Sequence, residues 1–231
     1  KKLGVVAVKQ SLEDEGTSYD DLLIMRELSN RSKLKLDIKV GGCEDGMVAP
    51  MVESDYALTK FIQVLRNNTR QNLYVNFESI QAFKNLNKIL KNPDFKKLKG
   101  VVIGRSDLVG SIGLGKDSVD SKKTYNLVYP ALKKIRKQKM IVKMGGSITS
   151  KSKFFVNKLY QKKLIDIIET RNIQLKLNNK TIANLENIME EIFKFEILWL
   201  KFAHLKSKKT KLRLKNDYLN RIKVLKKRLT S

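Results

Sequence analysis

The sequence has very little cysteine and histidine and no long apolar run. Its one cysteine, Cys43, excludes a disulfide within the chain. No apolar stretch approaches the ~20 residues that a membrane-spanning helix needs, and the N-terminal residues lack the apolar segment of a secretion signal. We therefore expect a soluble cytoplasmic protein that does not bind a membrane.

The length and the hydrophobic content predict one main domain. With 231 residues, 42% of them hydrophobic, the chain can bury a substantial core, whereas two full domains would be a tight fit. The size suits a barrel slightly shorter than usual.

The charge is strongly positive, with 48 Lys and Arg against 23 Asp and Glu and a formal net charge of +25. Such a balance is typical of proteins that bind nucleic acid or another polyanion, but Lys, Asn and Ile are abundant everywhere, as a compositional bias would also produce. The excess is greatest from residue 201 onward, where Asp217 is the one acidic residue. The basic residues there are Lys201, Lys206, Lys208, Lys209, Lys211, Arg213, Lys215, Arg221, Lys223, Lys226, Lys227 and Arg228. A solvated helix face or a contact between subunits is the favoured interpretation of this run, and nucleic acid is the alternative.

Short β-rich runs alternate with helical patterns, which is typical of repeated βα units and a parallel sheet. Strands are predicted over Leu3 to Val8, Leu34 to Val40, Met47 to Val52, Leu73 to Phe77, Gly100 to Ile103, Met140 to Met144 and Leu164 to Ile168. Helices are predicted over Tyr19 to Ser29, Asp55 to Arg66, Ile80 to Leu90, Lys122 to Lys137 and Lys151 to Lys162. We expect an α/β fold with a TIM (β/α)8-type barrel over residues 1–177, for which the sequence shows seven strands rather than eight, and a basic helical extension over residues 178–231.

The extension is predicted to contain a long helix from Thr181 to about Leu205 and a second from Asp217 to Leu229. Trp199 has apolar neighbours at helical spacing, so we interpret it as a packing residue rather than a ligand platform.

One connection breaks the alternation. Only residues 41–46 separate the strand that ends at Val40 from the strand that begins at Met47, whereas a parallel crossover needs a dozen or more residues. Either these strands form a hairpin or part of the chain is missing near Glu44 and Asp45. Because every other connection in this region resembles a helical crossover, we predict that residues are missing there.

Glu78 and Asp107 each follow a short apolar run, Leu73 to Phe77 and Val101 to Ile103. If both strands belong to one barrel, their carboxyl ends bring the two acids together at the face where such barrels carry out chemistry. Two carboxylates there suggest a divalent metal site. The alternative is that each acid caps the helix that follows.

Three segments together resemble the HpcH/HpaI aldolase and citrate lyase family. They are Val48-Ala-Pro-Met-Val-Glu-Ser54, then Tyr74-Val-Asn-Phe-Glu-Ser79 with Asn85-Leu-Asn-Lys-Ile-Leu90, and then Gly100-Val-Val-Ile-Gly-Arg-Ser-Asp-Leu-Val-Gly-Ser-Ile-Gly113. Their order and spacing also match the family, and the resemblance covers about Gly4 to Arg171. It implies a TIM barrel of the phosphoenolpyruvate/pyruvate superfamily that forms an oligomer, expected here to be a homo-oligomer.

The resemblance also implies a metal site and a reaction. It maps the family's metal ligands onto Glu78 and Asp107, which would hold Mg²⁺ or Mn²⁺. The implied reaction is a carbon–carbon lyase or aldolase reaction through the pyruvate-type enolate of a 2-oxo acid. A related enzyme acting on an acyl thioester, similar to citrate lyase beta or malyl-CoA lyase, is an alternative.

Departures from the family bear on the reaction. The family uses an early His as general base, but the one histidine here is His204, in the distal helical region. Glu13 or Glu15 could replace it as proton carrier, although acid-rich loops are common. The residues expected to orient the substrate are Lys39, where the family has Arg, and Arg105, where it usually has Pro.

The missing His and Arg also leave room for a different class of function. A catalytically inactive barrel that serves as a binding or assembly module is the main alternative to an enzyme. The retention of both candidate metal ligands favours the enzyme. Glu169 lies two residues before Arg171, at the end of the last predicted strand. We interpret this ion-pair-capable sequence as a structural salt bridge at the rim of the barrel.

Overall fold

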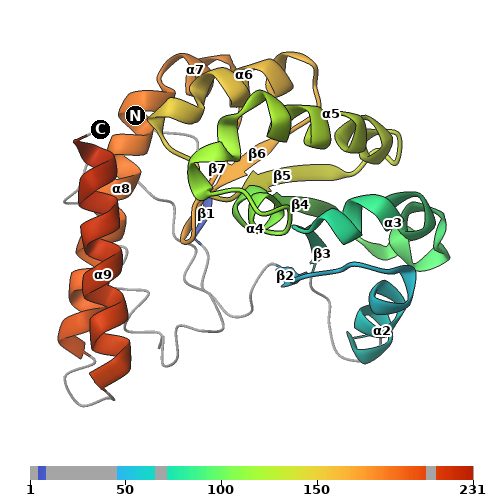
Figure 1. Ribbon diagram of the computed structural model, residues 1–231, viewed down its shortest axis with the longest axis horizontal. Coiled ribbons are helices and arrows are strands. Elements are labelled where there is room, and N and C mark those ends of the chain that lie inside the picture. Colours follow the sequence, from blue (N-terminus) through green and yellow to red (C-terminus); the bar gives the residue numbers. More distant parts are fainter. Residues whose placement is uncertain (1–4, 9–45, 66–71, 207–211, 231) are drawn as a thin grey trace. The chain divides into compact units, whose positions relative to one another are not determined.

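The computed structural model describes residues 5–8, 46–65, 72–206 and 212–230, and these residues form two compact units (Figure 1). One unit contains the described residues between 41 and 170. The other combines strand β1 (Val5–Val8) with the described residues from 171 onward.

The first unit is built on parallel strands that are neighbours in the order of the chain. They are β2 (Gly46–Ala49), β3 (Asn72–Phe77), β4 (Gly100–Gly104), β5 (Ile141–Gly145) and β6 (Ile167–Glu169). Parallel strands need crossovers, and helices supply them. The helical segments are α2 (Asp55–Leu65), α3 (Ile80–Lys91), η1 (Pro93–Lys97), α4 (Arg105–Gly110), η2 (Lys116–Asp120), α5 (Lys122–Arg136), η3 (Ser150–Ser152) and α6 (Lys153–Gln161).

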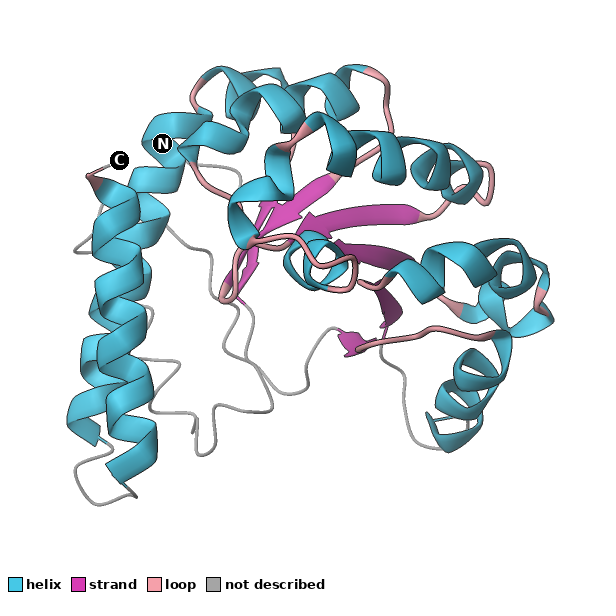
Figure 2. Ribbon diagram, viewed as in Figure 1, coloured by secondary structure: helices cyan, strands magenta, loops and turns pink. Residues whose placement is uncertain are grey.

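This alternation confirms the predicted α/β class. Figure 2 shows α3, α5 and α6 on one side of the strands. Within the described part of this unit β2 and β6 are the two outer strands, so the described strands do not by themselves close a barrel.

The two faces of the sheet differ in chemistry, because side chains alternate along each strand. The face that the amphipathic helices can cover is apolar, and each of its residues is at most 2% exposed: Val75, Phe77, Val101, Ile103, Val142, Met144 and Ile168. The opposite face carries Tyr74, Asn76, Lys143 and Glu169 as well as Val102. The polar groups of this unit's strands are therefore gathered on one face.

The second unit pairs β1 with β7 (Ile173–Lys176) in an antiparallel ladder, followed by α7 (Asn179–Ala183), α8 (Leu185–Lys206) and α9 (Leu212–Leu229). Helices α8 and α9 pack against each other, and Ile222 and Leu225 of α9 are buried. Lys223, Lys226 and Lys227 are exposed, so these basic residues of α9 lie on a solvated helix face. No helix in the described ranges is long and apolar enough to span a bilayer.

Several predicted elements can be compared with the structure. The strand predicted over Leu164 to Ile168 begins later, at Ile167, and the single helix predicted from Thr181 is interrupted at Asn184, which leaves helical geometry at the end of α7. Trp199 is 7% exposed and lies 5.7 Å from the ring of Phe202, which confirms its packing role.

One strand and one α-helix were missed by the sequence analysis. Strand β7 has four residues in a polar, helix-like context, and α4 is a short helix directly after β4 that has no room for an apolar repeat. The predicted helix over Tyr19 to Ser29, the strand over Leu34 to Val40 and the chain loss near Glu44 lie outside the described residues. The domain boundary at residue 177 stays a prediction.

A fully buried arginine holds the carboxyl end of the sheet together. Arg105, the first residue of α4, is 0% exposed. Its Nε donates to Gly145 O at 3.1 Å and its Nη2 donates to Gly146 O at 3.0 Å. Its Nη1 donates to the carboxylate of Asp120 and to Val119 O at 3.3 Å. One guanidinium thus ties α4 to the end of β5 and to η2.

The residues around Arg105 also stabilise its buried positive charge. Burial lowers the pKa of Arg105, while the charge of Asp120 and its hydrogen bond to Arg105 oppose that change. Asp120 also accepts a hydrogen bond from Ser152 Oγ at 2.7 Å, and the ring of Phe155 lies 4.9 Å from the guanidinium carbon.

We expect Arg105→Lys to lower the free energy of unfolding by roughly 1–3 kcal/mol, because an ammonium cannot reproduce the guanidinium fork and leaves buried carbonyl groups without donors. Urea unfolding followed by circular dichroism measures the change. An unchanged midpoint would show that these hydrogen bonds do not stabilise the fold.

The α8–α9 pair offers a matched test on two neighbouring residues. Leu225 is 3% exposed and Val224 is 51% exposed. Leu225→Ala should destabilise the chain by about 2–5 kcal/mol through lost burial and a cavity. Val224→Ala should change stability by less than about 0.5 kcal/mol. Equal effects in thermal unfolding would contradict the packing of α9 on α8.

Candidate metal and enolate site

Glu78 lies directly after β3 and is held in one position. Its side chain is 7% exposed. The backbone N–H of Met51 donates to Oε1 at 2.9 Å, and the side-chain amide of Asn76 donates to Oε2. A buried carboxylate that accepts two such hydrogen bonds is fixed in orientation, as a ligand group has to be.

Glu78 does not cap the helix that follows it. Ser79 is the N-cap of α3, and its Oγ accepts a hydrogen bond from Ala82 N at 3.2 Å. Asp107 is exposed in the first turn of α4, whose N-cap residue, Gly104, makes no side-chain cap hydrogen bond. The capping alternative is therefore wrong for Glu78.

Glu78 packs against the end of the neighbouring strand. A Cβ atom built on Gly104, the last residue of β4, would lie 2.7 Å from Glu78 Oε2. Ser111 Oγ, just after α4, accepts a hydrogen bond from Ile80 N at 2.9 Å. Glu78 thus lies alongside the junction of β4 and α4. That junction, at Gly104, precedes Asp107 by three residues. That both acids ligate one ion stays a prediction.

Sequence reasoning missed two groups around Glu78. Met51 has a φ of +50°, an uncommon backbone conformation for a residue with a side chain, and in it the N–H donates to the carboxylate. Asn76 Oδ1 is buried and, in the part of the chain that the structure describes, has no hydrogen-bond partner. The position of Asn76 two residues before Glu78 on the same strand face was the available signal.

The donor set fits a hard divalent cation. Carboxylate and amide oxygens are ligands that Mg²⁺ and Mn²⁺ accept, and Glu78 together with the side-chain carbonyl oxygen of Asn76 supplies them. Within the described ranges no three acidic, histidine or cysteine side chains gather closely enough to hold an ion by themselves. Mg²⁺ usually keeps several water ligands, which a substrate can replace.

The other predicted site residues are placed as follows. Glu13, Glu15 and Lys39 lie outside the described residues. Arg105 lies in the buried cluster described above, and its contacts favour a structural role over contact with a substrate. His204 lies on α8, in the other unit.

A buried cation lies deeper on the polar face of the sheet. Lys143 of β5 is 5% exposed, and its Nζ lies 3.7 Å from the centre of the Tyr74 ring. Such a desolvated cation–π contact is worth about 2 kcal/mol. Lys143 thus places positive charge on the face that also carries Glu78.

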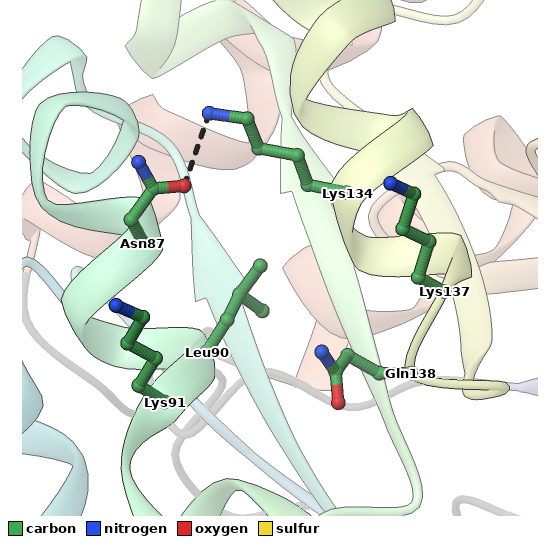
Figure 3. A pocket seen from close by; sticks show the side chains of 6 residues that line it. All are labelled: Asn87, Leu90, Lys91, Lys134, Lys137 and Gln138. Carbon is green, nitrogen blue, oxygen red and sulfur yellow. Dashed lines mark hydrogen bonds between the residues drawn. The ribbon is translucent and has the colours of Figure 1, made fainter.

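A hollow of about 300 Å³ lies between the C-terminal parts of α3 and α5 (Figure 3). It is lined by Asn87, Leu90, Lys91, Lys134, Lys137 and Gln138, and Lys134 Nζ donates to Asn87 Oδ1 at 3.0 Å. Because each of these helices runs back toward the amino ends of the strands, the hollow lies at the end of the sheet away from Glu78. It is not part of the candidate site.

Comparison with known proteins gives structural neighbours only. No family model matches the chain, and no curated protein sequence matches it. RipC from Yersinia pestis aligns with 14% identity and a TM-score of 0.46, over 76% of this chain and 86% of that one.

Two further solved structures are similar. An HpcH/HpaI aldolase/citrate lyase family protein from Burkholderia cenocepacia J2315 aligns with 12% identity and a TM-score of 0.44, over 66% of this chain and 63% of that one. Citrate synthase SbnG aligns with 11% identity and a TM-score of 0.46, over 67% of this chain and 72% of that one. The Burkholderia protein bears the name of the family that the sequence motifs resemble.

Proposed function

We propose that this protein is a divalent-metal-dependent carbon–carbon lyase or aldolase that acts on a 2-oxo acid through a pyruvate-type enolate. The observation that carries the proposal is the geometry of Glu78. It is a buried carboxylate at the carboxyl end of a parallel strand, oriented by Met51 N and Asn76 and free of any capping role. Parallel α/β sheets bind their ligands at this end of the strands.

Glu78 and Asp107 would hold Mg²⁺ or Mn²⁺. When bound, the metal would act as a Lewis acid on the substrate ketone and stabilise the negative charge of the enolate. The contribution of the protein is orientation, because two hydrogen bonds fix the Glu78 carboxylate before any ligand arrives. Its burial also limits the water around it.

Two alternatives remain distinct from this proposal. An acyl thioester could replace the 2-oxo acid as substrate on the same residues. An inactive barrel that binds a partner would use other surfaces, such as the exposed lysines of α9. Subunit assembly and nucleic-acid binding both stay predictions.

The test is exchange of the methyl protons of pyruvate with D₂O, followed by NMR in the presence of Mg²⁺ or Mn²⁺. We expect exchange that EDTA abolishes. Glu78→Gln should reduce both Mn²⁺ affinity and exchange by more than about 100-fold, because it replaces a negatively charged ligand with a neutral amide, whereas loss of a residue behind a ligand typically costs 10–100-fold. Mn²⁺ binding is measured by electron paramagnetic resonance.

Glu190→Gln is the control, because Glu190 is exposed on α8 and pairs with Lys194. It should behave as the unaltered protein does. Mn²⁺ binding and exchange that survive Glu78→Gln would defeat the assignment. Mn²⁺ binding without pyruvate exchange in the unaltered protein would favour the thioester substrate.

A further inference from the structure

A second glutamate ends a strand on the same face as Glu78. Glu169 is the last residue of β6 and is 6% exposed. The register aligns Asn76, Val102, Lys143 and Ile167 across the four strands. Two residues further along each strand, the next row on this face is Glu78, Gly104, Gly145 and Glu169. The two acids therefore flank a pair of glycines.

The glycines leave space that the glutamates use. A Cβ atom on Gly104 would lie 2.7 Å from Glu78 Oε2, and one on Gly145 would lie 3.2 Å from Glu169 Cγ and 3.4 Å from its Oε1. Each glutamate thus leans over the adjacent inner strand, toward the other. Because neighbouring strands are about 4.8 Å apart, the two carboxylates lie on the order of 5–11 Å from each other. That interval is comparable to the length of a small 2-oxo acid.

A ligand in this interval would lie near one amide oxygen and one buried positive charge. Asn76 Oδ1 is buried beside Gly104, 3.0 Å from the Cβ position, and has no hydrogen-bond partner among the described residues. Lys143 provides buried positive charge one row deeper. A buried acceptor without a donor is costly unless a ligand satisfies it.

The proposed reaction needs a proton carrier, and the described strands of this unit present few titratable groups on this face. Among the described strands β3 to β6, the face presents Tyr74, Glu78, Lys143 and Glu169. Glu78 is assigned to the metal, and Lys143 and Tyr74 contact each other below the row. We infer that Glu169 carries the proton. This inference rests on the proposed function and competes with the prediction for Glu13 or Glu15.

The proton transfers balance. In the cleavage direction, the Glu169 carboxylate accepts the proton of the C4 hydroxyl of a 4-hydroxy-2-oxo acid. The C3–C4 bond breaks, its electron pair passes into the 2-oxo acid part, and an aldehyde leaves. Glu169 then returns the proton to C3, which yields the methyl group of a pyruvate-type product. The reverse of that last step removes a methyl proton from pyruvate.

The experiment compares Glu169→Gln, Glu169→Asp, Glu78→Gln and the control Glu190→Gln in the full chain. One readout is exchange of the methyl protons of pyruvate with D₂O in the presence of Mn²⁺. The other is Mn²⁺-dependent binding of oxalate, an inert mimic of the enolate, measured by calorimetry. Oxalate binding reports an intact fold and metal site without any proton transfer.

We expect Glu169→Gln to lower exchange by about 10²–10⁴-fold, the usual contribution of general acid–base catalysis, with Mn²⁺ and oxalate binding unchanged. Glu169→Asp keeps a carboxylate and should retain part of the exchange, and Glu78→Gln should lose binding and exchange together.

Exchange at the unaltered rate in Glu169→Gln would overturn the inference and return the role to Glu13 or Glu15. Loss of oxalate binding in Glu169→Gln would also overturn it, because Glu169 would then be a ligand or a structural group. If the unaltered protein neither binds oxalate with Mn²⁺ nor exchanges pyruvate protons, the proposed function itself fails.

Discussion

The packing of the helices on the sheet and the position of the candidate site both depend on the alternation of side chains along the parallel strands. One face, from Val75 to Ile168, is apolar and almost fully buried. The helices that connect the strands have apolar stripes of their own, so burial of this face joins sheet and helices. The other face is thereby left for polar groups. The separation of packing from chemistry follows from a period of two residues along each strand.

Burial of charged groups on the polar face of the sheet lowers the stability of the fold unless other contacts compensate for it. Lys143, Glu78 and Glu169 are all less than a tenth exposed, and isolated charges at such positions would destabilise the fold by several kcal/mol each. Tyr74 contacts Lys143, while Met51 and Asn76 donate to Glu78. Polar groups kept at this cost are common where a ligand is bound.

Arg105 shows how the carboxyl end of the sheet is held in register. Its hydrogen bonds reach the last residue of β5, the turn after it and the segment that leads into α5. Gly146, at a φ of +82°, lies so close to the start of α4 that a Cβ atom there would be 2.4 Å from Ser106 N. The turn that carries Asp107 is therefore fixed by packing against β5, and a fixed turn can present a side chain to the neighbouring Glu78.

The sequence by itself determined the α/β alternation, most strand positions from Met47 to Met144 and the placement of Glu78 at a strand end, because local hydrophobic periodicity specifies these features. It did not determine the role of Arg105, the contacts of Met51 and Asn76 with Glu78, or the position of Glu169 on the face that carries Glu78. Those depend on strand register and on contacts between residues up to 41 positions apart. Such contacts exist only once the strands are paired, so only the tertiary structure decided them.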